Sequence, residues 1–111
     1  MPLVAKNFGD ASMASELRFH PLVAKDLKAA VGWYDEISPS LGDRFRASVE
    51  QRFDSISLYP ESFGIVLVDA RAARVRGFPY LLLFEMKADA VEVLGVFHTA
   101  SDPSKWRSRL I

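Results

Sequence analysis

Apolar and polar positions follow a helical period along the first half of the chain. Within residues 23–37, and again within residues 41–56, apolar side chains recur every three or four positions, which predicts two helices with one apolar face each. Residues 38–40, Ser-Pro-Ser, separate the two runs, because proline disfavours helical geometry in the residue before it. Ser40 and Asp43 form a capping pattern at the start of the second helix. Two amphipathic helices joined this closely are expected to pack as an antiparallel hairpin.

Strand patterns lie on both sides of the two helices. Residues 16–20 alternate polar and apolar, residues 65–68 form a β-branched run, and residues 71–76 contain the alternation Arg-Val-Arg. Residues 80–84 are apolar on both faces, which predicts a central strand or one covered by the helices, and residues 91–97 return as its partner. The order is strand, helix, helix and then about three strands. It predicts a single α+β domain with a mostly antiparallel sheet and the helical hairpin on one face.

The start of the chain shows neither period. We interpret residues 1–14 as a loosely ordered extension, which leaves residues 15–111 as the folded domain. The segment Pro-Leu-Val-Ala-Lys at residues 2–6 recurs at residues 21–25, either by chance or because the first copy mimics the second. No apolar run reaches the ~18–20 residues that span a bilayer, and a secretory signal pattern is absent. We therefore expect a cytoplasmic protein with no membrane segment.

Composition and charge narrow the function classes. Half of the 111 residues are hydrophobic, which supports one domain with a real core and excludes a disordered chain. The chain has no Cys, and His20 and His98 lie far apart, so we expect no disulfide framework, metal centre or cofactor. The 14 basic and 14 acidic residues cancel. Residues 1–69 hold 7 basic and 10 acidic residues, however, and residues 70–111 hold 7 basic and 4 acidic ones, so the strand-rich part is basic.

Short motifs carry a resemblance to a known family. They are Phe78-Pro79-Tyr80, a strand ending in Val96-Phe97-His98, and Asp102-Pro103 followed by Trp106 and Arg109. The helical part adds Trp33-Tyr34, Leu41-Gly42 and Phe45. Over roughly residues 17–109 the chain resembles the RelE/ParE superfamily of type II toxins. This resemblance implies a small cytoplasmic toxin that an antitoxin protein neutralises. Members similar to ParE, of the plasmid stabilisation type, inhibit DNA gyrase, whereas members similar to RelE cut messenger RNA on the ribosome.

Candidate site residues follow from these two activities. RNA cleavage needs an acid, a base and cations around the phosphate, for which His98 is the candidate acid or base and Arg76 the candidate phosphate clamp. Tyr80 is the candidate that stacks on a base or positions it. We interpret five residues as binding residues for a partner: Arg74, Arg76, Phe78, Trp106 and Arg109. Structural alternatives are a solvated strand face for the arginines, a core position for Tyr80, a hydrogen-bonding role for His98, and Trp106 as an anchor of the tail.

The charge count decides between the two activities, and one departure from the family pattern keeps a degenerate member open. The family often has the pattern His-x-x-Arg-Asp-Pro, and this chain has Ser101 in place of that arginine. A ribosome-directed nuclease is expected to have a large excess of Lys and Arg, and the chain has none overall. We therefore favour a ParE-like gyrase inhibitor without a catalytic centre. The alternatives are a RelE-like endoribonuclease and a degenerate member that only binds its antitoxin. We expect the antitoxin to cover the helical hairpin and the edge of the sheet with an amphipathic helix or an extended strand. Without antitoxin, a homodimer through the same apolar surface is a further alternative.

Overall fold

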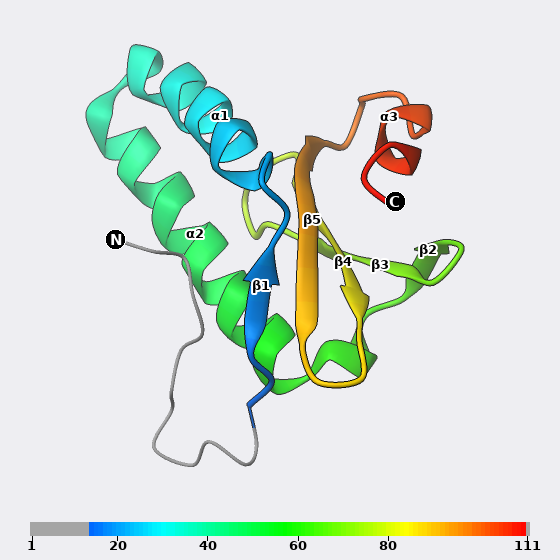
Figure 1. Cartoon of the computed structure of the whole chain (residues 1–111). Helices are drawn as coiled ribbons and strands as arrows, with labels where there is room; N and C mark the ends of the chain where they lie inside the picture. Colours follow the sequence, from blue (N-terminus) through cyan, green and yellow to red (C-terminus); the bar gives the residue numbers. More distant parts are fainter. Residues whose placement is uncertain (1–13, 111) are drawn as a thin grey trace.

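The computed structural model describes residues 14–110 (Figure 1). In chain order the elements are β1 (Leu17–Phe19), α1 (Val23–Ile37), α2 (Pro39–Leu58), the 3-10 helix η2 (Pro60–Ser62), β2 (Ile65–Leu67), β3 (Ala70–Arg74), β4 (Tyr80–Met86), β5 (Val91–His98) and α3 (Ser104–Arg107). The predicted extension at residues 1–14 and the first copy of Pro-Leu-Val-Ala-Lys lie outside the described residues, except for Ala14. The second copy leads into α1, where the Val23 side chain is fully buried.

The two long helices form where the apolar spacing predicts them, but the predicted cap of α2 is wrong. Pro39 occupies the first turn of α2, where its missing N–H is not needed and its fixed φ suits the helix. Ser38 is therefore the capping residue, and its Oγ accepts a hydrogen bond from the Leu41 backbone N–H at 3.1 Å. Ser40 does not cap the helix, and Asp43 pairs instead with an arginine three residues later, at 3.0 Å.

The sheet has five strands in the order β1-β5-β4-β3-β2. Every neighbouring pair is antiparallel except β1 and β5, which are parallel, so the predicted α+β fold with a mostly antiparallel sheet is confirmed. Four strands follow the helices where about three were expected, because residues 65–74 form a separate hairpin that turns at Val68. Val68 has a φ of 52°, an unusual value for a β-branched residue. The Arg-Val-Arg alternation belongs to a strand only in part, since β3 ends at Arg74.

Side chains from both faces of the sheet build two apolar clusters. Leu82 and Phe84 of β4 are fully buried on the helix side, in the same cluster as Phe45 of α2. Leu81 and Leu83 point to the opposite side, where the C-terminal segment covers them. Figure 1 shows the same layering, with α1 and α2 together on one side of the sheet and α3 on the other. β4 is therefore apolar on both faces because both faces are covered.

A bulge in β5 changes which backbone groups face the edge of the sheet. Leu83 pairs with Gly95 whereas Phe84 pairs with Val93, so Leu94 is an extra residue in β5. The pairing with β1 ends at Val93. The second half of β5 therefore has an edge that no strand covers, and its backbone groups need other partners.

Candidate functional site

A groove of about 640 Å³ lies between α1 and α2. Its apolar residues are Ala24, Leu27, Val31, Gly32, Val49 and Phe53, and its charged residues are Lys28, Asp35, Arg46 and Glu50. We call it the helical groove. A Cβ added at Gly32 would have no heavy atom within 4 Å, so the groove is open at this position. An apolar surface flanked by charges of both signs suits an amphipathic segment of another protein.

The helical groove is bounded by a close approach of the two helices. Arg46 Nη2 of α2 lies 3.4 Å from Asp35 Oδ2 of α1, and both side chains are largely exposed. A Cβ at Gly42 would collide with the Asp35 carboxylate, so this side chain would have to move if Gly42 were replaced. The groove is therefore bounded by contacts within the helical hairpin itself.

The outer face of α1 has two large apolar side chains that the core does not use. Trp33 is 64% exposed and Ile37, one turn further along, is 62% exposed. Neighbouring exposed apolar side chains of this size are typical of a surface that contacts another molecule. The apolar period placed Ile37 on the buried face of the helix, which is wrong, and Trp33 entered only through the family motif, so the sequence identified neither residue as a binding candidate.

The motif residues Phe78 and Tyr80 lie in an aromatic cluster under the two helices. The Phe78 ring is 5.0 Å from the Tyr34 ring and 5.1 Å from the Phe45 ring, measured between centroids. Tyr80 lies 5.2 Å from Phe45. Burial raises the pKa of the Tyr80 phenol above its ordinary value. Both residues therefore help to dock the turn before β4 onto the core.

The other two candidate catalytic residues are His98, the last residue of β5, and Arg76. His98 pairs with Tyr80 across β5 and β4, with ring centroids 5.2 Å apart. The His98 side chain is exposed, and its Nδ1 accepts a hydrogen bond from the Ala100 backbone N–H at 3.0 Å. Arg76 lies in the turn between β3 and β4. The structure thus brings His98 and Tyr80 together, and among the described residues no hydrogen bond joins Arg76 to either of them.

The backbone around the candidate arginines is tied to α2. Arg74 ends β3 and its carbonyl oxygen accepts a hydrogen bond from Arg52 Nε at 2.7 Å. The Arg76 carbonyl oxygen accepts one from Ser48 Oγ, also at 2.7 Å. Both arginine side chains are exposed. These two contacts fix the turn while leaving the two guanidinium groups at the surface.

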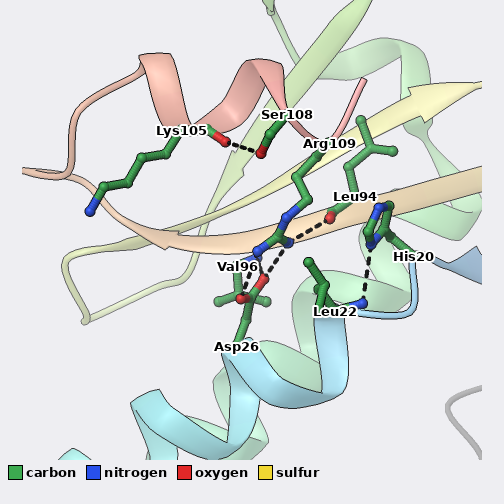
Figure 2. Close-up of polar contacts among 8 residues, drawn as sticks. All are labelled: His20, Leu22, Asp26, Leu94, Val96, Lys105, Ser108 and Arg109. Atoms are coloured by element: carbon green, nitrogen blue, oxygen red, sulfur yellow. Dashed lines mark hydrogen bonds and ion pairs between the residues drawn. The ribbon is translucent and has the colours of Figure 1, made fainter. Parts of the chain in front are cut away.

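Arg109 lies in a largely buried ion pair (Figure 2). The pair contacts the backbone of β5 along the edge that no strand covers. Its two Nη atoms lie 2.7 and 3.0 Å from the carboxylate oxygens of Asp26 on α1. Arg109 Nη1 also donates to the Leu94 carbonyl at 2.9 Å, and the Val96 N–H donates to Asp26 Oδ2 at 3.0 Å. The bulge directs both backbone groups toward this pair. The ion pair therefore joins α1, β5 and the C-terminal segment.

Trp106 and Arg109 also pack on the same ring of β5. The Trp106 ring lies 6.2 Å from the Phe97 ring, and the Arg109 guanidinium carbon lies 5.0 Å above it. A Cβ at Gly95 would approach Phe97 within 2.5 Å and Arg109 Nη1 within 2.7 Å, so only glycine leaves room for this arrangement. The structure thus places Trp106 as an anchor of the tail, as its structural alternative predicts.

The described residues 14–110 contain no group of three or more His, Cys, Asp or Glu side chains placed to hold a metal ion. In the same range, the helices are too short or too polar to cross a membrane.

Comparisons with known proteins agree with this architecture. Residues 17–103 match the family described as "ParE toxin of type II toxin-antitoxin system, parDE". A solved structure titled "Chromosomal ParDE TA system from P. aeruginosa" superposes with a TM-score of 0.67 at 17% identity, covering 78% of this chain and 96% of that chain. A search of curated protein sequences gave no significant match. Because the family match covers most of its length, the chain belongs to the ParE toxin family of type II toxin-antitoxin systems.

Proposed function

We propose that this chain inhibits DNA gyrase through protein contacts and is neutralised by an antitoxin that occupies the helical groove. The match to the ParE toxin family over residues 17–103 carries this proposal. The surroundings of the candidate catalytic residues also support a toxin without a catalytic centre. Tyr80 packs in the aromatic cluster, and among the described residues no hydrogen bond joins Arg76 to Tyr80 or His98. Inhibition of gyrase requires the protein to act in the cytoplasm.

The helical groove suits an antitoxin segment for two reasons. Its apolar residues can bury the apolar face of an amphipathic helix or an extended segment, which is the main source of affinity in such complexes. Lys28 can pair with an acidic residue of that segment at the rim. A segment of this kind is often disordered until it binds, so it loses conformational entropy on binding and needs a rigid groove to achieve high affinity.

The target is tested by expressing the chain in a bacterium without its antitoxin, with purified gyrase as a second assay. We expect filamentation with a DNA-damage response, and accumulation of gyrase-cleaved plasmid in the purified assay. His98→Ala and Arg76→Ala should both retain these effects. Cut messages with an early stop of protein synthesis, lost in both variants, would establish the nuclease alternative instead. Normal growth with no effect on purified gyrase would indicate a degenerate member.

The antitoxin site is tested by filling the helical groove from Gly32. A Cβ at Gly32 meets no heavy atom within 4 Å, and Gly32→Trp removes a flexible glycine from the middle of α1, so the fold should tolerate it. Gly64→Trp is the matched control, since Gly64 also has open space and lies outside the groove. We expect the protein from the adjacent reading frame to co-purify with Gly64→Trp and not with Gly32→Trp. Equal recovery would exclude the groove. If the free chain forms a homodimer through this groove, Gly32→Trp should also reduce its sedimentation coefficient to that of a monomer.

A further inference from the structure

We propose that a basic strip on α2 binds the phosphate backbone of duplex DNA. The basic strip consists of Arg44, Ser48, Gln51, Arg52 and Ser55 of α2, together with Arg76 in the turn after β3. Direct DNA contact by this chain goes beyond the proposed inhibition of gyrase, which requires only protein contacts. It also involves a surface other than the helical groove, since the two share no residue.

The geometry of the strip is set by the helix and by the docked turn. Arg44, Ser48, Gln51 and Ser55 are spaced by four, three and four residues, so they follow one side of α2. With a rise of ~1.5 Å per residue they span about 17 Å, the axial length of about five nucleotides in one DNA strand. The hydrogen bond from Ser48 Oγ to the Arg76 carbonyl, at 2.7 Å, holds the turn beside this side of the helix. The surface is therefore preorganised for a linear polyanion.

A small hollow lies within the strip. It has a volume of about 120 Å³ and is lined by Ser48, Gln51, Arg52, Ser55 and Arg76. A hollow of this volume holds several water-sized groups, such as the oxygens of a phosphate. No carboxylate is among the residues that line it. Arginine and glutamine side chains donate to DNA phosphates in protein–DNA complexes, whereas the hydroxyl protons of Ser48 and Ser55 are already donated to the carbonyls of Arg76 and Gln51.

The three arginines of the strip have no carboxylate partner within residues 14–110, a property that they share with Arg71, Arg74 and Arg107. Within residues 14–110, ion pairs neutralise Arg18, Arg46 and Arg109, whereas none involves Arg44, Arg52 or Arg76. Arg52 uses Nε for the Arg74 carbonyl and lies 5.7 Å from the Phe63 ring centre, which orients its guanidinium group. A bound anion would pair with charges that have no counter-charge within residues 14–110.

The composition of the strip favours duplex DNA over the two nearest alternatives. Between Arg44 and Ser55, the side of α2 that forms the strip has no aromatic side chain, and single-stranded nucleic acids are bound mainly by stacking on aromatic side chains. It also has no large exposed apolar residue, and tight protein interfaces depend on such anchors. Phosphate contacts alone suit a regular duplex backbone.

The test measures fluorescence anisotropy of a short labelled DNA duplex with the full chain, without gyrase or antitoxin. Three phosphate contacts predict that the affinity falls about 40-fold between ~50 and ~200 mM salt. Arg44→Gln with Arg76→Gln removes two contacts, so the affinity of this double variant should fall only about fourfold over the same range. Arg18→Gln is the control, because Arg18 lies on β1 and pairs with Asp89 at 3.1 Å. It should behave like the unmodified chain. Circular dichroism confirms that each variant is folded.

Several results would overturn the proposal. They are the absence of binding at ~50 mM salt, an equal salt response in the double variant and the control, and tighter binding of single-stranded DNA than of the duplex. Displacement of the duplex by polyglutamate at equal charge concentration would assign the strip to an acidic protein. Because gyrase is absent from the assay, these outcomes do not depend on whether the chain inhibits gyrase.

Discussion

Replacing Asp26 with Asn should destabilise the domain by about 3 kcal/mol. The Asp26 carboxylate accepts hydrogen bonds from both Nη atoms of Arg109 and from the Val96 N–H. Asp26 and Arg109 side chains are only 15% and 11% exposed, so the variant leaves a poorly hydrated guanidinium group without its counter-charge. Breaking a buried ion pair costs ~3–5 kcal/mol, and we take the lower end because water still reaches both groups. A domain of this size is stable by only ~5–15 kcal/mol in total.

Urea unfolding followed by tryptophan fluorescence measures this loss. Trp33→Phe as the background leaves Trp106, which lies against Phe97 and reports on the tail. At a slope of ~1–3 kcal/mol per M, the midpoint should fall by roughly 1–3 M. Asp35→Asn is the matched control on the same helix, because its ion pair with Arg46 is exposed and should contribute less than ~1 kcal/mol.

A double-mutant cycle separates the ion pair from the other contacts of Asp26. Asp26→Leu combined with Arg109→Met should cost less than the sum of the single variants by ~1–3 kcal/mol, because neither charge is then left unpaired. Hydrogen exchange of the Val96 amide should accelerate in every variant that lacks the carboxylate. If Asp26→Asn were no more destabilising than Asp35→Asn, the ion pair would not hold the tail.

Three further predictions concern local geometry. Val68→Gly should raise the unfolding free energy by ~0.5–1 kcal/mol in urea titrations, because the exposed Val68 has a left-handed φ of 52°; a loss would show that Val68 is unstrained. Ser38→Ala should cost ~1 kcal/mol by thermal unfolding and Ser40→Ala much less; the reverse order would restore Ser40 as the cap. A hydrogen bond from the Ser104 N–H lowers the pKa of Asp102 below 3.8, so its stabilisation is present above pH 3.8 and is lost as the pH falls through the folded-state pKa. The chemical shift of the Ser104 amide should change over the same pH range, and Asp102→Asn should abolish this pH dependence.

The helices and most strands could be predicted because their signals are local. The period of apolar residues gave α1 within its observed bounds, and two-sided apolarity identified β4 as covered on both faces. The cap of α2 was wrong because two serines flank Pro39, and the choice between them depends on where the proline sits in the first turn. The motif around Phe78 and Tyr80 indicated the family correctly, although these residues turn out to pack into the core.

The features that the sequence could not reveal join distant parts of the chain. Asp26 and Arg109 are 83 positions apart, and nothing in their local patterns relates them. Gly95 inside a mostly apolar strand was an available signal, since glycine in a strand often marks a bulge or a close approach. The groove and the basic strip depend on how α2 packs against α1 and against the turn after β3, which local periodicity does not specify.

The parallel pairing of β1 with β5 has a consequence for the order of folding. Leu17 pairs with Val91, so closing this contact orders a loop that contains both helices and three strands. Contacts between distant residues form slowly because loop closure costs entropy before the contact can stabilise it. We therefore expect the helical hairpin and the β3–β4–β5 meander to form first, with β1 docking late. During synthesis the helical groove would then exist before the sheet is complete, so an antitoxin could engage a chain that is not yet able to act on its target.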